Sequence, residues 1–157
     1  MTGVLPSPCS PAPDIACRVA AGAQESAEHA RIRRAVFVDE QQLFTNDRDA
    51  HDQDEATVYL LGLVNGQPAG AVRLYPFDAE DVWKGDRLAV LPQYRRSRIG
   101  GPLVRLAVAT AKARGASRMV AQVQAANTAF FLSLGWTADG KPYDYLGLPH
   151  QPMWIAC

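Results

Sequence analysis

The chain has 157 residues, of which 48% are hydrophobic and 20% are charged, and its 16 basic and 16 acidic residues give a formal net charge of zero. This length and composition are typical of one globular domain with a single core. The zero net charge argues against a nucleic-acid-binding or membrane-surface protein, because both classes usually carry a basic surface.

Four prolines lie among small residues in segment 1–14. Proline fixes φ and lacks a backbone N–H donor, so this segment is predicted to be a disordered tail before a domain at 15–157. The domain is predicted to begin with a strand at 15–19 and a helix at 23–37 that has one apolar face.

The acidic segment 46–55 is predicted to be a solvated loop. The spacing of His51 and its neighbouring aspartates matches no EF-hand, which needs a central glycine and a final glutamate, so we expect no metal site there. Two β-rich runs follow at 57–64 and 67–75, and the Asn65-Gly66 pair between them is a strong hairpin signal.

The second half of the chain alternates between strands and helices. The predicted elements are a strand at 83–90, a helix at 100–114, a strand at 117–123, a helix at 126–134, and strands around 143–145 and 153–155. The element order predicts an α/β fold with a mixed, mostly antiparallel sheet.

Three cysteines occur without a CxxC pair, which is typical of free thiols in a reducing compartment. No apolar run approaches the ~20 residues of a membrane span, and the N-terminus does not resemble a signal peptide. We therefore expect a cytoplasmic protein without a membrane partner.

Segment 85–103 combines a strand, an arginine-rich loop and glycines at the start of a helix. A helix N-terminus offers free N–H groups and a positive dipole end, and Gly100 and Gly101 would let an anion approach the backbone closely. The pattern predicts a phosphate site. The sequence contains neither GxxxxGK[ST] nor GxGxxG after a strand, so neither a P-loop nor a dinucleotide site is supported.

Residues 94–101, Tyr-Arg-Arg-Ser-Arg-Ile-Gly-Gly, resemble the acetyl-CoA pyrophosphate loop of the GNAT acyltransferases, whose pattern is Gln/Arg-x-x-Gly-x-Gly/Ala. In this register Arg95 takes the first position and Gly100 the last, and Arg98 replaces the middle glycine. That replacement puts the tightness of the pyrophosphate turn in question, because a side chain now occupies the place of a glycine.

Further segments resemble the same family, in the same order. Segment 127–136 resembles its late helix, and 32–41 and 147–153 resemble the "R-x-x-V-F-V-x-E-Q" and "G-I-P-H-x-x-M" signatures of one GNAT branch. Segments 49–52 and 83–90 resemble a bacterial subfamily that is encoded in nitrilase-containing, nitrogen-starvation gene clusters.

The resemblance implies one GNAT domain whose mixed sheet is splayed in the middle, with helices on both faces. It implies acetyl-CoA or another acyl-CoA as cosubstrate, no metal, a small-molecule amine as acceptor, and a homodimer as one expected state. The cofactor-binding residues that it implies are Leu88, Ala89, Val90, Arg95, Arg96, Ser97, Arg98, Ile99, Gly100, Gly101, Asn127 and Phe131.

Acyl transfer to an amine also needs proton transfers. The tyrosine that usually acts as the acid in this family is replaced here by Phe131, so either the thiolate leaves unassisted or Tyr143 or Tyr145 substitutes. The sheet-face position of both tyrosines favours a packing role over catalysis.

Three residues are candidates for the general base that accepts the amine proton. Glu40 ends the first predicted helix, where this branch places a polar residue at the substrate cleft. His150 belongs to a residue type that titrates near neutral pH. Asp86 opens the strand expected to bind pantetheine, although an ion pair with Arg87 is the role we expect more strongly.

Three alternatives stay open at this stage. Phe131 and Arg98 motivate a non-catalytic, acyl-CoA-binding regulatory protein, and a protein that kept the fold but lost the cofactor would act only through interactions. Acyl-homoserine-lactone synthesis shares the fold and the Val36–Gln41 signature, but the short chain argues against it.

Overall fold

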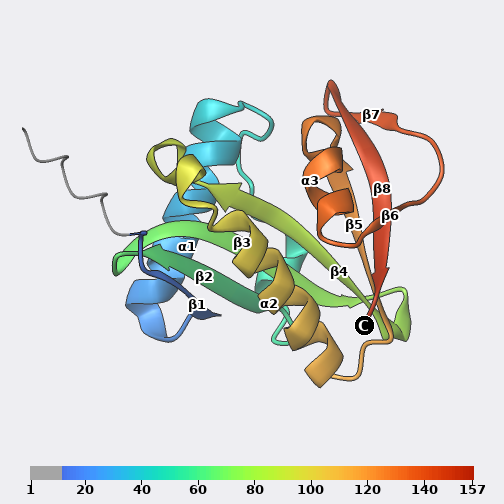
Figure 1. Ribbon diagram of the computed structural model, residues 1–157, viewed down its shortest axis with the longest axis horizontal. Coiled ribbons are helices and arrows are strands. Elements are labelled where there is room, and N and C mark those ends of the chain that lie inside the picture. The colour runs from blue at the N-terminus through green and yellow to red at the C-terminus, as the bar shows by residue number, and fades with distance from the viewer. Residues whose placement is uncertain (1–11) are drawn as a thin grey trace, which may run out of the picture.

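A single mixed sheet of eight strands runs through the computed structural model, which describes residues 12–157 (Figure 1). The strand order is β1-β2-β3-β4-β5-β8-β6, and β7 forms an additional pair with β8. The strands are β1 (Ile15–Val19), β2 (Val58–Val64), β3 (Gln67–Phe77), β4 (Ala79–Val90), β5 (Arg118–Gln124), β6 (Thr137–Ala138), β7 (Tyr143–Tyr145) and β8 (Leu148–Ala156). Among the strand pairs within 12–157, β4 and β5 alone run parallel.

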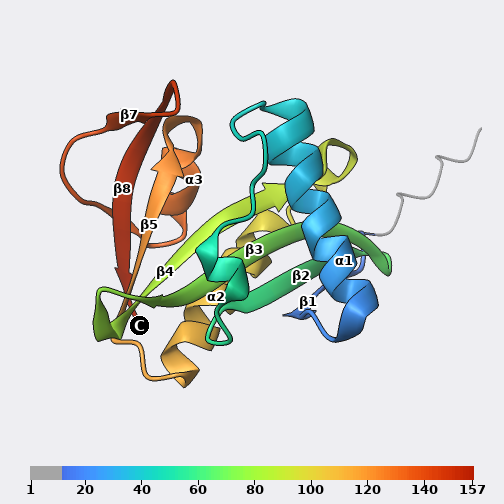
Figure 2. The same cartoon turned by 180° about the vertical axis from the view of Figure 1, so that it is seen from behind.

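Helices cover both faces of this sheet (Figures 1 and 2). Helix α1 and its π-helical continuation η1 lie on one face, and α2 and α3 lie on the other. The helices are α1 (Gly22–Arg33), η1 (Arg34–Glu40), η2 (Ala50–Gln53), η3 (Pro92–Ser97), α2 (Gly100–Ala113), η4 (Ala125–Asn127) and α3 (Thr128–Ser133). The predicted α/β fold with a mixed, mostly antiparallel sheet is confirmed.

Alternation along the central strands produces one core on each face, because successive side chains of a strand point to opposite sides. Leu60 and Leu74 pack toward α2, whereas Leu61 and Ala71 pack toward α1 and η1. The hairpin at Asn65-Gly66 is confirmed as the β2–β3 turn.

Strands β4 and β5 pair over only a short part of their length. Val82–Gly85 of β4 pairs with Arg118–Ala121 of β5, after which β4 continues beside β3 and β5 continues beside β8. Gly85 permits this close pairing, because a Cβ there would lie 2.6 Å from the Met119 methyl carbon. The expected splay in the middle of the sheet is therefore present.

A β-bulge marks the point where β4 leaves β5. The β3–β4 register changes between Ala71, which faces Ala89, and Arg73, which faces Asp86. Arg87 lies inside this irregular stretch with φ of 53°. Since a bulge bends its strand and increases the local twist, it helps to direct the second half of β4 away from β5.

Some element boundaries differ from the predictions. The first helix continues to Glu40 as a π-helix, β4 begins at Ala79, and β8 begins at Leu148 rather than near residue 153. The predicted tail at 1–14 lies, up to residue 11, outside the described residues.

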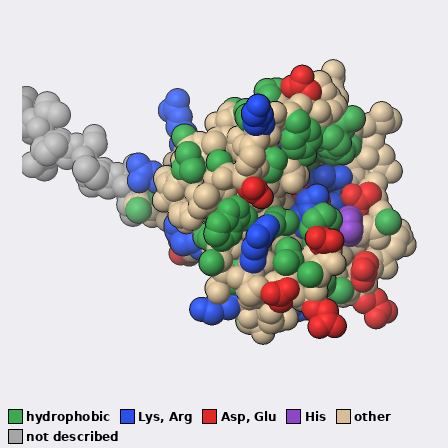
Figure 3. All heavy atoms as spheres, turned by 90° about the vertical axis from the view of Figure 1, so that its right-hand side faces the viewer, with side chains coloured by type: hydrophobic (Ala, Val, Ile, Leu, Met, Phe, Trp, Pro, Cys, Tyr) green, Lys and Arg blue, Asp and Glu red, His purple; other side chains and the backbone are tan. Residues whose placement is uncertain are grey.

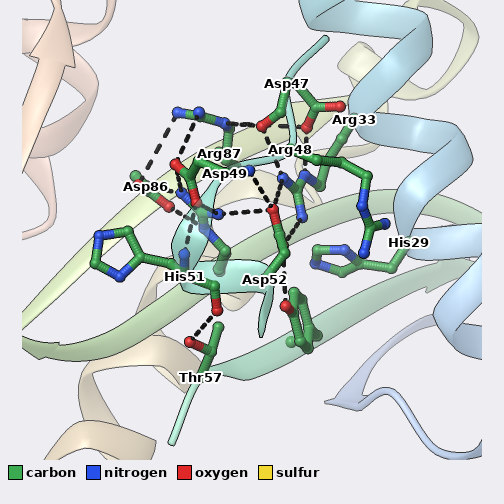
Figure 4. A network of polar contacts seen from close by, with 12 residues as sticks. His29, Arg33, Asp47, Arg48, Asp49, His51, Asp52, Thr57, Asp86 and Arg87 are labelled. Carbon is green, nitrogen blue, oxygen red and sulfur yellow. Dashed lines mark hydrogen bonds and ion pairs between the residues drawn. The ribbon is translucent and has the colours of Figure 1, made fainter. Parts of the chain in front are cut away.

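The prediction that the acidic segment 46–55 is a solvated loop holds for most of its exposed residues but is wrong for Asp47, Asp49 and Asp52. Their carboxylates meet two buried arginines, Arg33 of α1 and Arg73 of β3, whose exposed fractions are 1% and 0% (Figure 4). Arg33 binds Asp47 at 2.5 Å and Asp52 at 2.7 Å. Composition shows that a segment is acidic, but it cannot show that distant arginines are buried beside it.

Asp52 joins the two arginines. Oδ2 of Asp52 lies 3.0 Å from Arg73 Nη1. Oδ1, which binds Arg33, also accepts a hydrogen bond from the Tyr59 hydroxyl at 2.9 Å. Burial alone would raise the pKa of Asp52, but hydrogen bonds from Arg33 and other donors hold that pKa far below its ordinary value. The network fixes the 46–55 segment against the sheet.

Arg33→Met is expected to lower the free energy of unfolding by about 3–5 kcal/mol, because it leaves Asp47 and Asp52 buried without their main counter-ion. Arg31→Met is the matched control, since Arg31 lies on the same helix in an exposed pair with Glu28 and should cost less than ~1 kcal/mol. Urea denaturation measures both. Equal losses in the two variants would contradict a stabilising role for the network.

Candidate active site

A cavity of about 350 Å³ occupies the gap between the diverging strands. On the α2 face its walls include Val104, Ala107 and Phe131, and on the α1 face they include Tyr75 and His150. Figure 3 views the molecule from the side of β8 and shows acidic, basic and histidine side chains close together on that face. The cavity lining therefore includes residues from both faces of the sheet.

An amide pair spans the gap on the α1 face. Gln124 Nε2, on β5, donates to Gln41 Oε1 at 2.9 Å, and Gln41 follows the last residue of η1. The π-helical turn places both Phe37 and Gln41 on the cavity wall. This contact joins the two halves of the sheet beyond the point where β4 and β5 stop pairing.

The loop after β4 forms a tight turn at the N-terminus of α2. Arg98 has φ 64° and ψ 26°, the left-handed conformation that glycine adopts most readily. The Ser97 hydroxyl donates to Tyr94 O at 2.5 Å and accepts from Ile99 N at 3.3 Å. The turn is thus formed in spite of the arginine at the position of the family's middle glycine.

Cationic side chains gather around the start of α2. Among residues 12–157, no carboxylate pairs with Arg96, Arg98 or Arg105. The Arg105 guanidinium lies over Gly101, where an added Cβ would meet its nitrogens at 3.4 Å. Cations are unfavourable at the positive end of a helix dipole, so this arrangement suits a bound anion.

Arg105 was not among the residues predicted from the sequence. The sequence does indicate that Arg105 lies near the phosphate site. Residues four apart on a helix lie on the same face, and Arg105 follows Gly101 at that spacing.

Arg95 differs from its neighbours because all three of its guanidinium nitrogens donate to protein groups. Its guanidinium binds Glu40 at 2.5 and 2.7 Å and donates from Nε to Val90 O at 3.2 Å. The hydrogen bonds from Arg95 lower the pKa of Glu40. Glu40 does not line the cavity, so its position argues against a role as the base and indicates that it joins η1 to the arginine loop.

His150 lines the cavity with 5% of its surface exposed. Its Nδ1 lies 2.8 Å from Leu148 O. A carbonyl oxygen can only accept a hydrogen bond, so Nδ1 carries the proton and Nε2 of the neutral ring keeps its lone pair. This is the form that a general base requires.

Asp86 also lines the cavity, but its carboxylate is held by other groups. Arg73 donates to its two oxygens at 2.8 Å each, and the Tyr75 hydroxyl donates at 3.0 Å. Arg87, the partner expected from the sequence, lies 4.0 Å away. Because both carboxylate oxygens are held by Arg73, the geometry of Asp86 suits holding β4 against β3.

The residues predicted to bind the cofactor fall into two groups on the α2 face. Leu88, Asn127 and Phe131 line the cavity. Residues 95–101 form the turn before α2, and a Cβ added to Gly100 would lie 3.4 Å from the Phe130 ring, so the turn abuts α3. Of the other predicted residues, Ala89 is buried in the core beneath α1 and η1, and Val90 packs against the opposite core.

Comparison with known proteins identifies the family. Residues 24–136, most of the chain, match the family described as acetyltransferase (GNAT). The chain belongs to the GNAT acetyltransferase family. GNAT acyltransferases use an acyl-CoA cosubstrate and act on small-molecule acceptors.

Solved structures of GNAT proteins share the fold. An acyl-CoA N-acyltransferase from Pseudomonas aeruginosa has 24% identity and a TM-score of 0.77, over 92% of this chain and 99% of its own. Escherichia coli ElaA has 21% identity and a TM-score of 0.78, over 90% and 98%. BjaI, a CoA-dependent acyl-homoserine lactone synthase, has 20% identity and a TM-score of 0.74, over 92% and 83%.

The described part of the chain lacks two features that are relevant to cofactors and membranes. Within 12–157, no three side chains of His, Cys, Asp or Glu are arranged to hold a metal ion. No helix in the same range has the length and apolar character needed to cross a membrane.

Arg98→Gly is expected to raise the free energy of unfolding by about 0.5–1 kcal/mol, because glycine relieves the cost of a side chain in the left-handed conformation. Arg96→Gly is the control: Arg96 lies in η3, without a positive φ, and the change should destabilise by about 0.5–1 kcal/mol. Chemical denaturation tests both. A loss of stability in Arg98→Gly as large as that in Arg96→Gly would contradict the proposed strain.

Proposed function

We propose that this protein is an acyl-CoA-dependent N-acyltransferase that transfers an acyl group, in the simplest case acetyl, directly to the amine of a small molecule. The observation that carries this proposal is the cavity between β4 and β5, which has an arginine-rich helix start beside it on one face and His150 on the other. The two reactants would enter from opposite faces of the sheet and meet in the gap.

The α2 face supplies the features needed to bind CoA. Arg96 and Arg98 directly precede α2 in the chain, and the Arg105 guanidinium lies over Gly101 in its first turn. This concentration of positive charge at a helix N-terminus suits a diphosphate. Among residues 12–157, no strand pairs with β4 on its β5 side beyond Gly85. The backbone groups of Leu88–Val90 on that edge are therefore candidates to bind the pantetheine arm.

On the α1 face, His150 would accept the proton of the attacking amine through Nε2. Attack on the thioester carbonyl places negative charge on its oxygen, which the backbone N–H groups along the unpaired edge of β4 would stabilise. Phe131 cannot protonate the leaving sulfur. A thiol pKa of about 8.5 allows the sulfur to leave as the thiolate.

The finer assignments follow from the same resemblance. Segments 49–52 and 83–90 support membership of the bacterial subfamily associated with nitrogen-starvation gene clusters, and hence a role in cytoplasmic nitrogen metabolism. Phe131 favours one alternative, a regulatory GNAT protein that binds acyl-CoA without turnover. Acylation of any amine would exclude that alternative.

Acetyl-CoA is expected to raise the melting temperature, since a ligand at ~100 times its Kd adds about 2.7 kcal/mol to the stability of the folded state. The Arg96→Ala/Arg98→Gly double variant should bind at least about tenfold more weakly, because it removes two charges and keeps the turn. Arg114→Ala, at the other end of α2, is the matched control. Absence of any shift with CoA esters would refute the proposed function.

His150→Gln is expected to lower kcat by about 10²–10⁴-fold, because glutamine cannot accept a proton, while the Kd for acetyl-CoA stays unchanged. Glu40→Gln should lower kcat by less than about threefold, because Glu40 lies outside the cavity. Steady-state kinetics and acetyl-CoA titration measure both. A larger loss in Glu40→Gln than in His150→Gln would transfer the role of base to Glu40.

A further inference from the structure

We propose that the acceptor is an arylalkylamine, an amine joined by a short chain to an aromatic ring, and that its ring binds against Tyr143 and Tyr145. This inference rests on the proposed function and specifies the substrate class of the same site.

The two tyrosines frame His150 at the edge of the cavity. They lie two residues apart on β7, and Tyr143 faces His150 in the β7–β8 register. The ring of Tyr145 lies 5.5 Å from that of His150 at an interplanar angle of 87°, and the ring of Tyr143 lies 6.3 Å away. An amine whose body packs on these rings would bring its nitrogen close to the candidate base.

Both tyrosines line the cavity and are nevertheless 42% and 44% exposed. Adjacent exposed aromatic side chains on a short strand are typical of a binding surface rather than of a core. The Tyr143 hydroxyl donates to Gln122 Oε1 at 2.9 Å, which fixes the orientation of its ring. Part of the surface is therefore ordered before any ligand binds.

Aromatic rings also line the part of the cavity that β3 and the acidic segment form. His51 stacks on Tyr75 at a centroid distance of 3.7 Å and an interplanar angle of 14°. Phe44 lies beneath the Arg87 guanidinium, 4.2 Å from it. Rings therefore contribute to the acceptor half of the cavity from β3, β7, β8 and the segments that follow η1.

The charged groups of the same half are already engaged. Arg73 binds the carboxylates of both Asp49 and Asp86. Arg87 lies over Phe44 and donates to a backbone carbonyl, and the Lys84 ammonium lies 5.0 Å from the Phe77 ring centroid. An acceptor that sought an ion pair with Arg73, or with the carboxylates that Arg73 holds, would compete with these contacts, whereas an aromatic amine does not depend on them.

Matched amines test the inference with acetyl-CoA as donor. We expect kcat/KM for 2-phenylethylamine to exceed that for 2-cyclohexylethylamine by roughly two- to tenfold, since the two differ in aromatic contacts rather than in size. Phenylalanine, which adds a carboxylate, and spermidine should both be poorer acceptors than 2-phenylethylamine. Equal or better use of the cyclohexyl, carboxylated or polyamine acceptor would overturn the inference.

Variants of Tyr145 test whether its ring contacts the acceptor. Tyr145→Leu should reduce the preference for the phenyl over the cyclohexyl amine to less than about twofold, and Tyr145→Phe should preserve it because the ring remains. Loss of the preference in both variants, or in neither, would contradict stacking on Tyr145.

Binding measurements separate failure of this inference from failure of the proposed function. Calorimetric titration of the two amines into protein saturated with CoA should show the same aromatic preference without any turnover. If CoA binds but neither turnover nor binding favours the phenyl amine, the acceptor class is wrong and the CoA site stands. If CoA does not bind, the proposed function fails, and the inference fails with it.

Discussion

The short parallel pairing of β4 with β5 is the constraint on which the site depends. Because that pairing ends at Gly85 and Ala121, the two strands follow different neighbours and leave a gap in the middle of a continuous sheet. The gap provides an unpaired backbone edge and a cavity that is lined by residues from both faces of the sheet. A sheet paired along its full length would have core packing in the same place and no site for chemistry.

Separated strands need support from other contacts, and the buried ion network supplies it on the α1 face. Arg73 binds Asp86 across the β3–β4 pair at the bulge, while Asp52 connects Arg73 to Arg33 of α1. The second half of β4 is thereby held to β3 although β5 no longer supports it. On the same face, the hydrogen bond from Gln124 to Gln41 spans the gap and joins the two halves of the sheet.

The sequence predicted the features that depend on local order: the β2–β3 hairpin, the succession of elements, the GNAT family and the loop at 94–101. It did not predict contacts between distant residues. Arg95 and Glu40 are 55 residues apart and Asp49 and Arg73 are 24 apart, and composition gives no sign that they pair. The left-handed conformation of Arg98 was also not predicted, because an arginine gives no sign of it in the sequence. The subfamily, the domain boundary at 15 and the roles of individual site residues stay predictions.

Determination of the structure with bound CoA tests the central claim most directly. We expect density for the pantetheine arm between β4 and β5, hydrogen-bonded to the backbone of Leu88–Val90. The diphosphate should lie at the turn before α2, and the sulfur should lie in the cavity on the side of His150. CoA bound away from the gap, or a gap closed by continued pairing of β4 with β5, would contradict that claim.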